Sequence, residues 1–318
     1  MRKLLILAAA AVFAAAGLVG CNKRNAGAET KKKAPDAAGQ FESGVRYANG
    51  WGIPKDPKKA AECFRKAAEQ GHAGAQAALG ACYFSGDGVK IDHAEAEKWL
   101  RKAAAQGNET AAEMLSMMGT LKSDAPPETA EDASKLLKRV FSSLSISPKQ
   151  FDELLKNAAS GDVESQCLVG LSYFAGTPVK RNYAEAAKWF RKAAERGNPK
   201  AQLLLAMCYD EGAGVKKDER EAVKWLRKAA EQGLAPAQSL LGECFQNGDG
   251  VPKNSSRAAY WLRKAAEQGY PDAQLKLGVC YQNGDGVNEG LQQAAYWYRK
   301  AAEQGHADAK KALEELGY

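Results

Sequence analysis

The sequence predicts an all-α protein, a solenoid of helix-turn-helix repeats that are each 36 residues long. An Ala-Gln pair, or Ser-Gln in one copy, recurs at this stride, and the second half of nearly every copy contains Trp-x-Arg-Lys-Ala-Ala. Two short helices cannot bury their apolar faces alone, so neighbouring copies must stack into a continuous array. The copies begin at Ala75, Ser165, Ala201, Ala237 and Ala273, and the stride places an earlier one near Gly39.

Before the array, residues 1–20 have the pattern of an export signal. A positively charged start, Met1-Arg2-Lys3, precedes an uncharged stretch rich in alanine and leucine, and Leu18-Val19-Gly20-Cys21 ends the segment. The order Leu-x-Gly-Cys resembles the bacterial lipobox, which implies a lipoprotein signal peptide and a lipidated Cys21. The alternative is an ordinary cleavable signal in which Cys21 is incidental.

The lipobox resemblance also implies where the chain is located. Aspartate after the lipidated cysteine tends to retain such proteins at the inner membrane, and Asn22 stands in that position here. We therefore expect an exported chain that is anchored in the cell envelope through its N-terminal lipid. In an organism with two membranes, the expected site is the outer membrane, facing the periplasm.

Residues 21–38 should form a disordered tether, because they have no apolar periodicity and too few apolar residues to bury. Their charge argues against nucleic acid as a partner. The chain carries +7; it loses +2 with Arg2 and Lys3, and the tether accounts for another +3, which leaves +2 on the folded part. A nucleic-acid binder carries its excess positive charge on the folded surface. We expect no nucleic-acid partner.

Each repeat is expected to hold two helices, and the copy from Ala237 illustrates both. Glycine in Gly248-Asp249-Gly250-Val251 adopts the left-handed conformation that ends a helix without strain. The second helix should run over residues 256–268. The first helix has its apolar face at Ala237, Leu241, Cys244 and Phe245, and the second at Ala258, Trp261, Leu262, Ala265 and Ala266.

These motifs resemble the Sel1-like repeat, a relative of the tetratricopeptide repeat. The resemblance rests on Ala-Gln-x-x-Leu-Gly-x-Cys-Tyr-x-x-Gly-x-Gly-Val followed by Ala-x-x-Trp-x-Arg-Lys-Ala-Ala-Glu-Gln-Gly. It implies a right-handed α-solenoid. Two repeats are expected over residues 39–110 and four over 165–308, with a charged capping helix over 309–318.

The array is interrupted over residues 111–164, where an irregular helical insert is expected. The copies at Ala75 and Ser165 are 90 residues apart, which is 18 more than two repeats require. Ser147-Pro148-Lys149-Gln150 has the features of a helix start. The segment 151–160 could therefore replace the usual second helix of a repeat.

The resemblance implies that the first helices line the concave side of the solenoid, where a groove would bind a protein or peptide partner. Three positions of each first helix share the face opposite its core stripe, and they grade from apolar to polar along the chain. An exposed apolar row of this kind marks an interaction surface; the alternative is that some of these residues pack under the next repeat. The predicted groove residues are Phe84, Leu171, Phe174, Leu203, Met207, Asp210, Glu243, Gln246, Val279 and Gln282.

The cysteines other than Cys21 are expected to serve mainly as small core residues. Cys82, Cys208, Cys244 and Cys280 occupy equivalent positions on the apolar face of successive first helices. Cys63 and Cys82 are the one pair that we would test for a disulfide, because export permits disulfides. The spacings match no zinc motif, and we expect neither a metal nor a cofactor.

The leading functional prediction is a cell-envelope scaffold or adaptor without enzymatic activity. Two alternatives follow from the resemblance. Some similar proteins have penicillin-binding or β-lactamase-like activity, but no lysine here stands three residues after a serine, as the Ser-x-x-Lys signature requires. Others serve in polysaccharide export, so a polysaccharide bound by aromatic residues is the second alternative. No catalytic residue is predicted.

Overall fold

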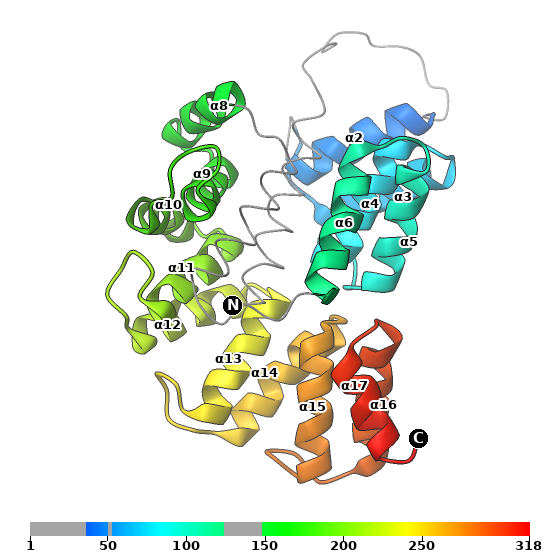
Figure 1. The fold of residues 1–318 in the computed structure, drawn as a ribbon, viewed down its shortest axis with the longest axis vertical. Coiled ribbons are helices and arrows are strands. Elements are labelled where there is room, and N and C mark those ends of the chain that lie inside the picture. Colours follow the sequence, from blue (N-terminus) through cyan, green and yellow to red (C-terminus); the bar gives the residue numbers. More distant parts are fainter. Residues whose placement is uncertain (1–35, 50–52, 124–147) are drawn as a thin grey trace. The chain divides into compact units, whose positions relative to one another are not determined.

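The computed structural model describes residues 36–49, 53–123 and 148–318, and the regular structure in these ranges is entirely helical (Figure 1). The helices fall into two units. The N-terminal unit contains α2 (Ala37–Asn49), α3 (Pro57–Glu69), α4 (Ala73–Ser85), α5 (His93–Ala104) and α6 (Glu109–Ser123). The C-terminal unit contains α8 (Pro148–Ala159), α9 (Val163–Ala175), α10 (Tyr183–Glu195), α11 (Pro199–Glu211), α12 (Glu219–Glu231), α13 (Ala235–Asn247), α14 (Ser255–Glu267), α15 (Pro271–Asn283), α16 (Leu291–Glu303) and α17 (Ala307–Glu315).

Within each unit, every helix packs against the next one in the chain, which confirms the predicted all-α solenoid of 36-residue helix pairs. The expected signal peptide, Cys21 and the tether up to residue 35 lie outside the described residues. Among the residues that are described, no helix is both long enough and apolar enough to cross a membrane.

Capping side chains mark the start of five of the second helices, whereas α16 begins after Gly290 without a side-chain cap. Asp218 precedes α12 and accepts the backbone N–H of Glu221 at 3.0 Å, and Asn254 precedes α14 and accepts that of Arg257 at 2.9 Å. Such a cap satisfies one of the N–H groups that a helix start leaves without a partner. Asp56, Asp92 and Asn182 cap α3, α5 and α10 in the same way.

In four repeats the glycine-rich turn packs against the preceding repeat. Gly250 lies in the turn between α13 and α14 with a φ of 66°, and a β-carbon there would lie 2.3 Å from the carbonyl oxygen of Glu219 at the start of α12. Only glycine permits this approach. The equivalent turn glycines Gly88, Gly214 and Gly286 contact the preceding second helix equally closely.

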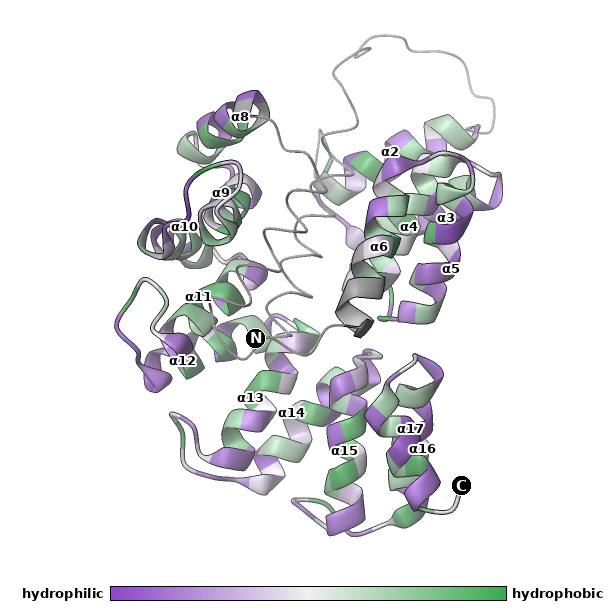
Figure 2. Ribbon diagram, viewed as in Figure 1, coloured by the Kyte–Doolittle hydropathy of each residue, from purple (hydrophilic) through white to green (hydrophobic). Residues whose placement is uncertain are grey.

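The core is built from alanines together with larger apolar residues on both helices of each pair. Ala229 and Ala230 of α12 are buried completely or nearly so, as is Leu241 of α13. Figure 2 shows hydrophobic and hydrophilic residues mixed along the helices, as expected when one face packs and the other meets water. The sequence placed Trp261 in the core stripe, but its side chain is only partly buried, and Leu262 fills the core instead.

A ladder of glutamines, which the sequence analysis did not identify, links the helices in the interior. The buried Gln202 of α11 donates its side-chain N–H to the carbonyl oxygen of Ala194 in the preceding repeat at 3.1 Å. Its own Oε1 accepts a hydrogen bond from Gln232 at 2.8 Å. Buried polar groups of this kind stabilise a fold only when they are paired. The Gln–Gln pairs are Gln70–Gln40, Gln106–Gln76, Gln232–Gln202, Gln268–Gln238 and Gln304–Gln274.

The ladder is interrupted in the repeat formed by α9 and α10. Arg196 stands where the other repeats have the donating glutamine, and its guanidinium donates to the carbonyl oxygen of Gly161. The Oε1 atom of Gln166 is therefore buried without a hydrogen-bond partner. Gln166 keeps its other bond, to the carbonyl oxygen of Ala158 at 3.1 Å.

The helix boundaries differ from the expected ones by a few residues. Helix α2 begins at Ala37, inside the expected tether, and α17 covers Ala307–Glu315 rather than 309–318. In the expected insert, α6 packs on α5 as a first helix would, and α8 packs on α9 as a second helix would. The segment 151–160 lies largely within α8, and residues 124–147 lie outside the described ranges.

Candidate interaction surfaces

The apolar part of the predicted groove is not exposed, and this prediction was wrong. These apolar side chains lie in the core of the solenoid and not on its surface. Phe174, for example, packs its ring against Tyr183 with the centroids 4.9 Å apart. The five apolar residues are at most 8% exposed: Phe84, Leu171, Phe174, Leu203 and Met207.

The remaining groove residues are partly or fully exposed, but three of them are engaged by neighbouring helices. Glu243 pairs with Lys276 of α15 at 2.6 Å. Gln246 contacts the sulfur of Cys280 at 3.4 Å, and Gln282 accepts the hydroxyl of Tyr298 at 2.6 Å. Glu243 and Gln246 thus contact the next repeat, and Gln282 contacts the second helix of its own repeat. These contacts leave few of the groups available to a ligand.

Asp210 and Val279 complete the predicted set, and both are exposed. Partial burial raises the pKa of the Asp210 carboxyl above its usual value. Val279 is a single exposed apolar side chain on α15, and isolated apolar residues are normal on protein surfaces. The predicted continuous apolar groove is therefore absent from the described residues.

Two exposed aromatic residues lie on second helices instead. Tyr260 of α14 is 53% exposed and Tyr296 of α16 is 51% exposed, at equivalent positions one repeat apart. Each packs edge-on against the tryptophan that follows it, Trp261 at 5.2 Å and Trp297 at 5.1 Å between ring centroids. We call these four residues the aromatic strip.

The sequence contains a signal for this strip in the residue that precedes the tryptophan of the second helices. The signal was missed because the second helices were assigned to packing. In other repeats the residue before the tryptophan is a lysine, as in Lys98, Lys188 and Lys224. The change from lysine to tyrosine occurs in the last two repeats alone, and about half of each tyrosine side chain stays exposed beside its tryptophan.

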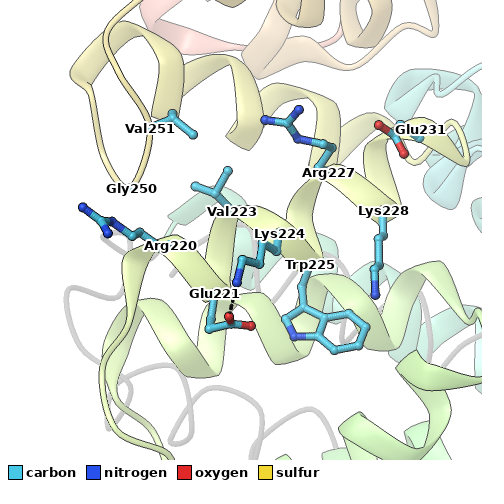
Figure 3. A pocket seen from close by; sticks show the side chains of 10 residues that line it. All are labelled: Arg220, Glu221, Val223, Lys224, Trp225, Arg227, Lys228, Glu231, Gly250 and Val251. Atoms are coloured by element: carbon cyan, nitrogen blue, oxygen red, sulfur yellow. Dashed lines mark hydrogen bonds and ion pairs between the residues drawn. The ribbon is translucent and has the colours of Figure 1, made fainter.

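A pocket of about 500 Å³ lies between α12 and the turn that contains Gly250 and Val251 (Figure 3). Four basic side chains line it. Lys224 pairs with Glu221, and the Lys228 ammonium lies 4.1 Å from the centre of the Trp225 ring. The full lining consists of Arg220, Glu221, Val223, Lys224, Trp225, Arg227, Lys228, Glu231, Gly250 and Val251.

Within the described ranges no cysteine forms a disulfide, so the candidate bridge between Cys63 and Cys82 is not formed in the structure. Cys82 belongs to the core around Phe64 and Leu79, whereas Cys63 is partly exposed outside that core. Complete burial raises the pKa of the Cys167 and Cys208 thiols to about 12. A thiol with so high a pKa is a poor nucleophile and a poor metal ligand at neutral pH.

Within residues 36–49, 53–123 and 148–318, no three or more histidine, cysteine, aspartate or glutamate side chains are placed to hold a metal ion. The surfaces that remain, the aromatic strip and the pocket, have the chemistry of recognition sites.

The fold and these surfaces define a helix-pair repeat protein of the interaction type. The chain belongs to the Sel1 repeat family: the family model for the Sel1 repeat matches residues 37–72, 73–108, 163–198, 199–234, 235–270 and 271–306. Each match begins two residues before the boundary expected from the Ala-Gln pairs, at or near the start of a first helix. No curated protein gives a significant sequence match.

Solved structures of the same fold include two that share about a third of their sequence with this chain. One is c5321, a protective antigen of uropathogenic Escherichia coli strains that displays an SLR fold, with 34% identity and a TM-score of 0.51. The alignment covers 88% of this chain and 64% of that protein, so this chain spans less than two thirds of its length. The other is a Sel1 repeat protein from Oxalobacter formigenes, with 32% identity, a TM-score of 0.49, and coverage of 88% and 76%.

A more distant structure, yeast Tom70, shares the fold alone. Its identity to this chain is 13% and its TM-score is 0.50, with coverage of 96% of this chain and 69% of Tom70. Sel1 repeat proteins are typically scaffolds for protein–protein interaction without enzymatic activity.

Proposed function

We propose that this chain is a lipid-anchored scaffold of the cell envelope that binds a protein or peptide partner through the aromatic strip on α14 and α16. The observation that carries the proposal is the exposure of Tyr260 and Tyr296 at equivalent positions of adjacent repeats. Tyrosine and tryptophan supply most of the binding energy at protein interfaces, because they bury large rigid surfaces at a low entropic cost.

The physical setting of the strip supports a binding role. Each exposed tyrosine is held by a tryptophan at its edge, so its ring is already ordered before a partner arrives. The Lys264 ammonium lies 5.7 Å from the centre of the Tyr260 ring. A partner surface with apolar and acidic groups would complement this strip.

The partner experiment compares the full-length chain with a Tyr260→Ala/Tyr296→Ala variant. Both serve as bait in cross-linked envelope extract, and each protein captured by the wild type is purified and titrated directly against both forms. We expect the double variant to weaken binding at least about tenfold, because interface tyrosines are frequent hot spots. Tyr318→Ala is the matched control, since Tyr318 is 56% exposed and lies outside the strip.

Two results would overturn the proposed partner class. If purified partners bind the double variant as tightly as the wild type, the strip is not the binding surface. If the chain instead binds oligosaccharides on a glycan array and loses them with the tyrosines, it is a polysaccharide-binding component. Robust turnover of nitrocefin by the purified chain would replace the scaffold with a hydrolase.

The envelope location rests on the sequence Leu18-Val19-Gly20-Cys21, and we propose that Cys21 carries the lipid. A Cys21→Ala variant should leave the membrane fraction and lose incorporation of a labelled fatty acid, whereas the wild type should retain both. Mass spectrometry of the mature N-terminus is the direct check. An unmodified cysteine in the wild-type protein would contradict the anchor.

A further inference from the structure

The pocket on α12 differs from the equivalent places in three other repeats because its central arginine, Arg227, has no tyrosine partner. In three repeats, the arginine of the Arg-Lys pair donates to a tyrosine hydroxyl on the next first helix. The distances are 3.1 Å for Arg65 to Tyr83, 2.6 Å for Arg191 to Tyr209 and 2.9 Å for Arg263 to Tyr281. At α12 the residue in the tyrosine position is Phe245, which has no hydroxyl.

Arg227 therefore has no hydrogen-bond or ion-pair partner among the described residues, and it lines the pocket. Glu231 stands one turn further along α12, but the two side chains form no ion pair, and Figure 3 shows them extending in different directions. A guanidinium group presents several donors in a rigid planar fork. Here that fork is available to a ligand.

A second arginine lines the same pocket. Arg220 also has no side-chain partner within the described part of the chain. Its position is Ala94, Ala184, Ser256 and Gln292 in four other repeats, and Lys58 in the first. Figure 3 shows Arg220 beside the Gly250 turn and Arg227 further along α12.

The floor between the two arginines is apolar. Val223 is 4% exposed and Val251 is partly exposed, and Figure 3 shows their side chains in the space between the guanidinium groups. The close approach of Gly250 to the Glu219 carbonyl holds the turn, and with it Val251, against α12. The site is therefore built from ordered elements.

We propose that this pocket binds an acidic peptide segment, with a carboxylate held between Arg220 and Arg227 and a small apolar side chain on Val223 and Val251. The proposal rests on the proposed scaffold function and names the chemistry of one part of the partner. The four basic and two acidic side chains of the lining leave a charge of +2. The carboxylate geometry matches the guanidinium fork.

The lining also selects against an extended polyanion. Glu221 and Glu231 flank the arginines, and each would repel a second phosphate of a nucleic acid or polyphosphate. Lys224 and Lys228 are already engaged by Glu221 and the Trp225 ring, which leaves a pair of cations rather than a continuous basic surface. A single carboxylate beside an apolar residue fits this arrangement.

The test uses the purified full-length chain and a fluorescent peptide of alternating glutamate and valine. A second peptide, with glutamine in place of every glutamate, serves as its counterpart. Fluorescence anisotropy at low salt should show binding of the glutamate peptide alone. Arg227→Gln and Arg220→Gln should each weaken it about tenfold, which is the usual size of one charge-assisted hydrogen bond. Arg263→Gln is the matched control, because Arg263 is bound to Tyr281, and it should leave affinity unchanged.

A second variant tests the mechanism without removing a charge. Phe245→Tyr supplies Arg227 with the hydroxyl found in other repeats, so it should also weaken the glutamate peptide. Three results would each overturn the proposal. They are equal binding of the two peptides, an unchanged affinity in Arg227→Gln, and displacement of the peptide by millimolar inorganic phosphate. Because the peptide is titrated against the purified chain, this outcome is separate from capture of a partner by the aromatic strip.

Discussion

The glutamine ladder shows how single residues determine the cohesion of the array. Gln202 is buried and uses both ends of its amide, whereas Gln166 has an Oε1 atom without a partner because Arg196 replaces the donor. A buried acceptor without a hydrogen bond costs about 1–3 kcal/mol. The repeat formed by α9 and α10 is thus the one described repeat whose ladder is broken internally.

Restoring the donor should stabilise the C-terminal unit. We expect Arg196→Gln to raise the free energy of unfolding by about 1 kcal/mol, because the new amide can donate to Gln166. The measurement is the midpoint of urea unfolding. Arg196→Ala is the control, since it removes the bond to Gly161 without adding a donor. An Arg196→Gln midpoint no higher than that of the wild type would contradict the role given to the ladder.

Phe174 is a core residue in the structure, although its sequence position predicted a binding role. Its side chain is 1% exposed, so truncation should remove packing and leave a cavity. We expect Phe174→Ala to lower the free energy of unfolding by about 3–5 kcal/mol. Tyr260→Ala, at an exposed site, should change it by about 1 kcal/mol or less. Comparable urea midpoints for the two variants would show that Phe174 is not in the core.

At the scale of elements, the glycine-rich turn couples one repeat to the one before it. Gly250 and Gly233 both have positive φ angles, 66° and 88°. A β-carbon on Gly250 would collide with the Glu219 carbonyl, whereas one on Gly233 would have no neighbour within 4 Å. A substitution at Gly233 therefore tests backbone strain alone, whereas one at Gly250 tests backbone strain together with a steric clash.

Alanine at these two positions should have unequal effects. Gly233→Ala should cost about 1 kcal/mol, which is the strain of a left-handed alanine. Gly250→Ala should cost at least about twice as much, because the backbone of the turn must also move away from α12. Thermal unfolding monitored by circular dichroism compares them, and equal losses would mean that the contact with Glu219 contributes nothing.

At the scale of the whole molecule, the thiols buried in several repeats should make the free energy of unfolding fall at alkaline pH. Burial raises the pKa of Cys167 and Cys208 from 9.0 to about 12 and that of Cys280 to about 11. In the unfolded chain these thiols lose their protons near pH 9, so above that pH the folded state binds more protons than the unfolded state. Stability should therefore be at its full value below pH 9 and fall as pH rises.

The expected loss is about 1 kcal/mol for each fully buried thiol between pH 8 and pH 10. Urea midpoints at the two pH values measure it. A Cys167→Ala/Cys208→Ala variant is the control, because its midpoint should fall less over the same range, even if it is lower throughout. The same loss in both proteins would assign the pH dependence to other groups.

The sequence by itself determined the 36-residue stride, the two helices of each repeat and the packing role of the alanines and most of the cysteines. These follow from local periodicity and glycine positions, which act within one repeat. Even the second-helix character of α8 was recognisable from its starting motif.

Only the tertiary structure decided which faces remain exposed, because exposure depends on what the next repeat covers. Phe174 and Met207 share a face with Asp210 in the sequence, yet the first two are buried in the folded chain. The contacts between repeats also show that Arg227 lacks the tyrosine partner that Arg65, Arg191 and Arg263 have. A residue's position in a repeat is a local property, but its freedom to meet a ligand depends on side chains 18 to 36 residues away.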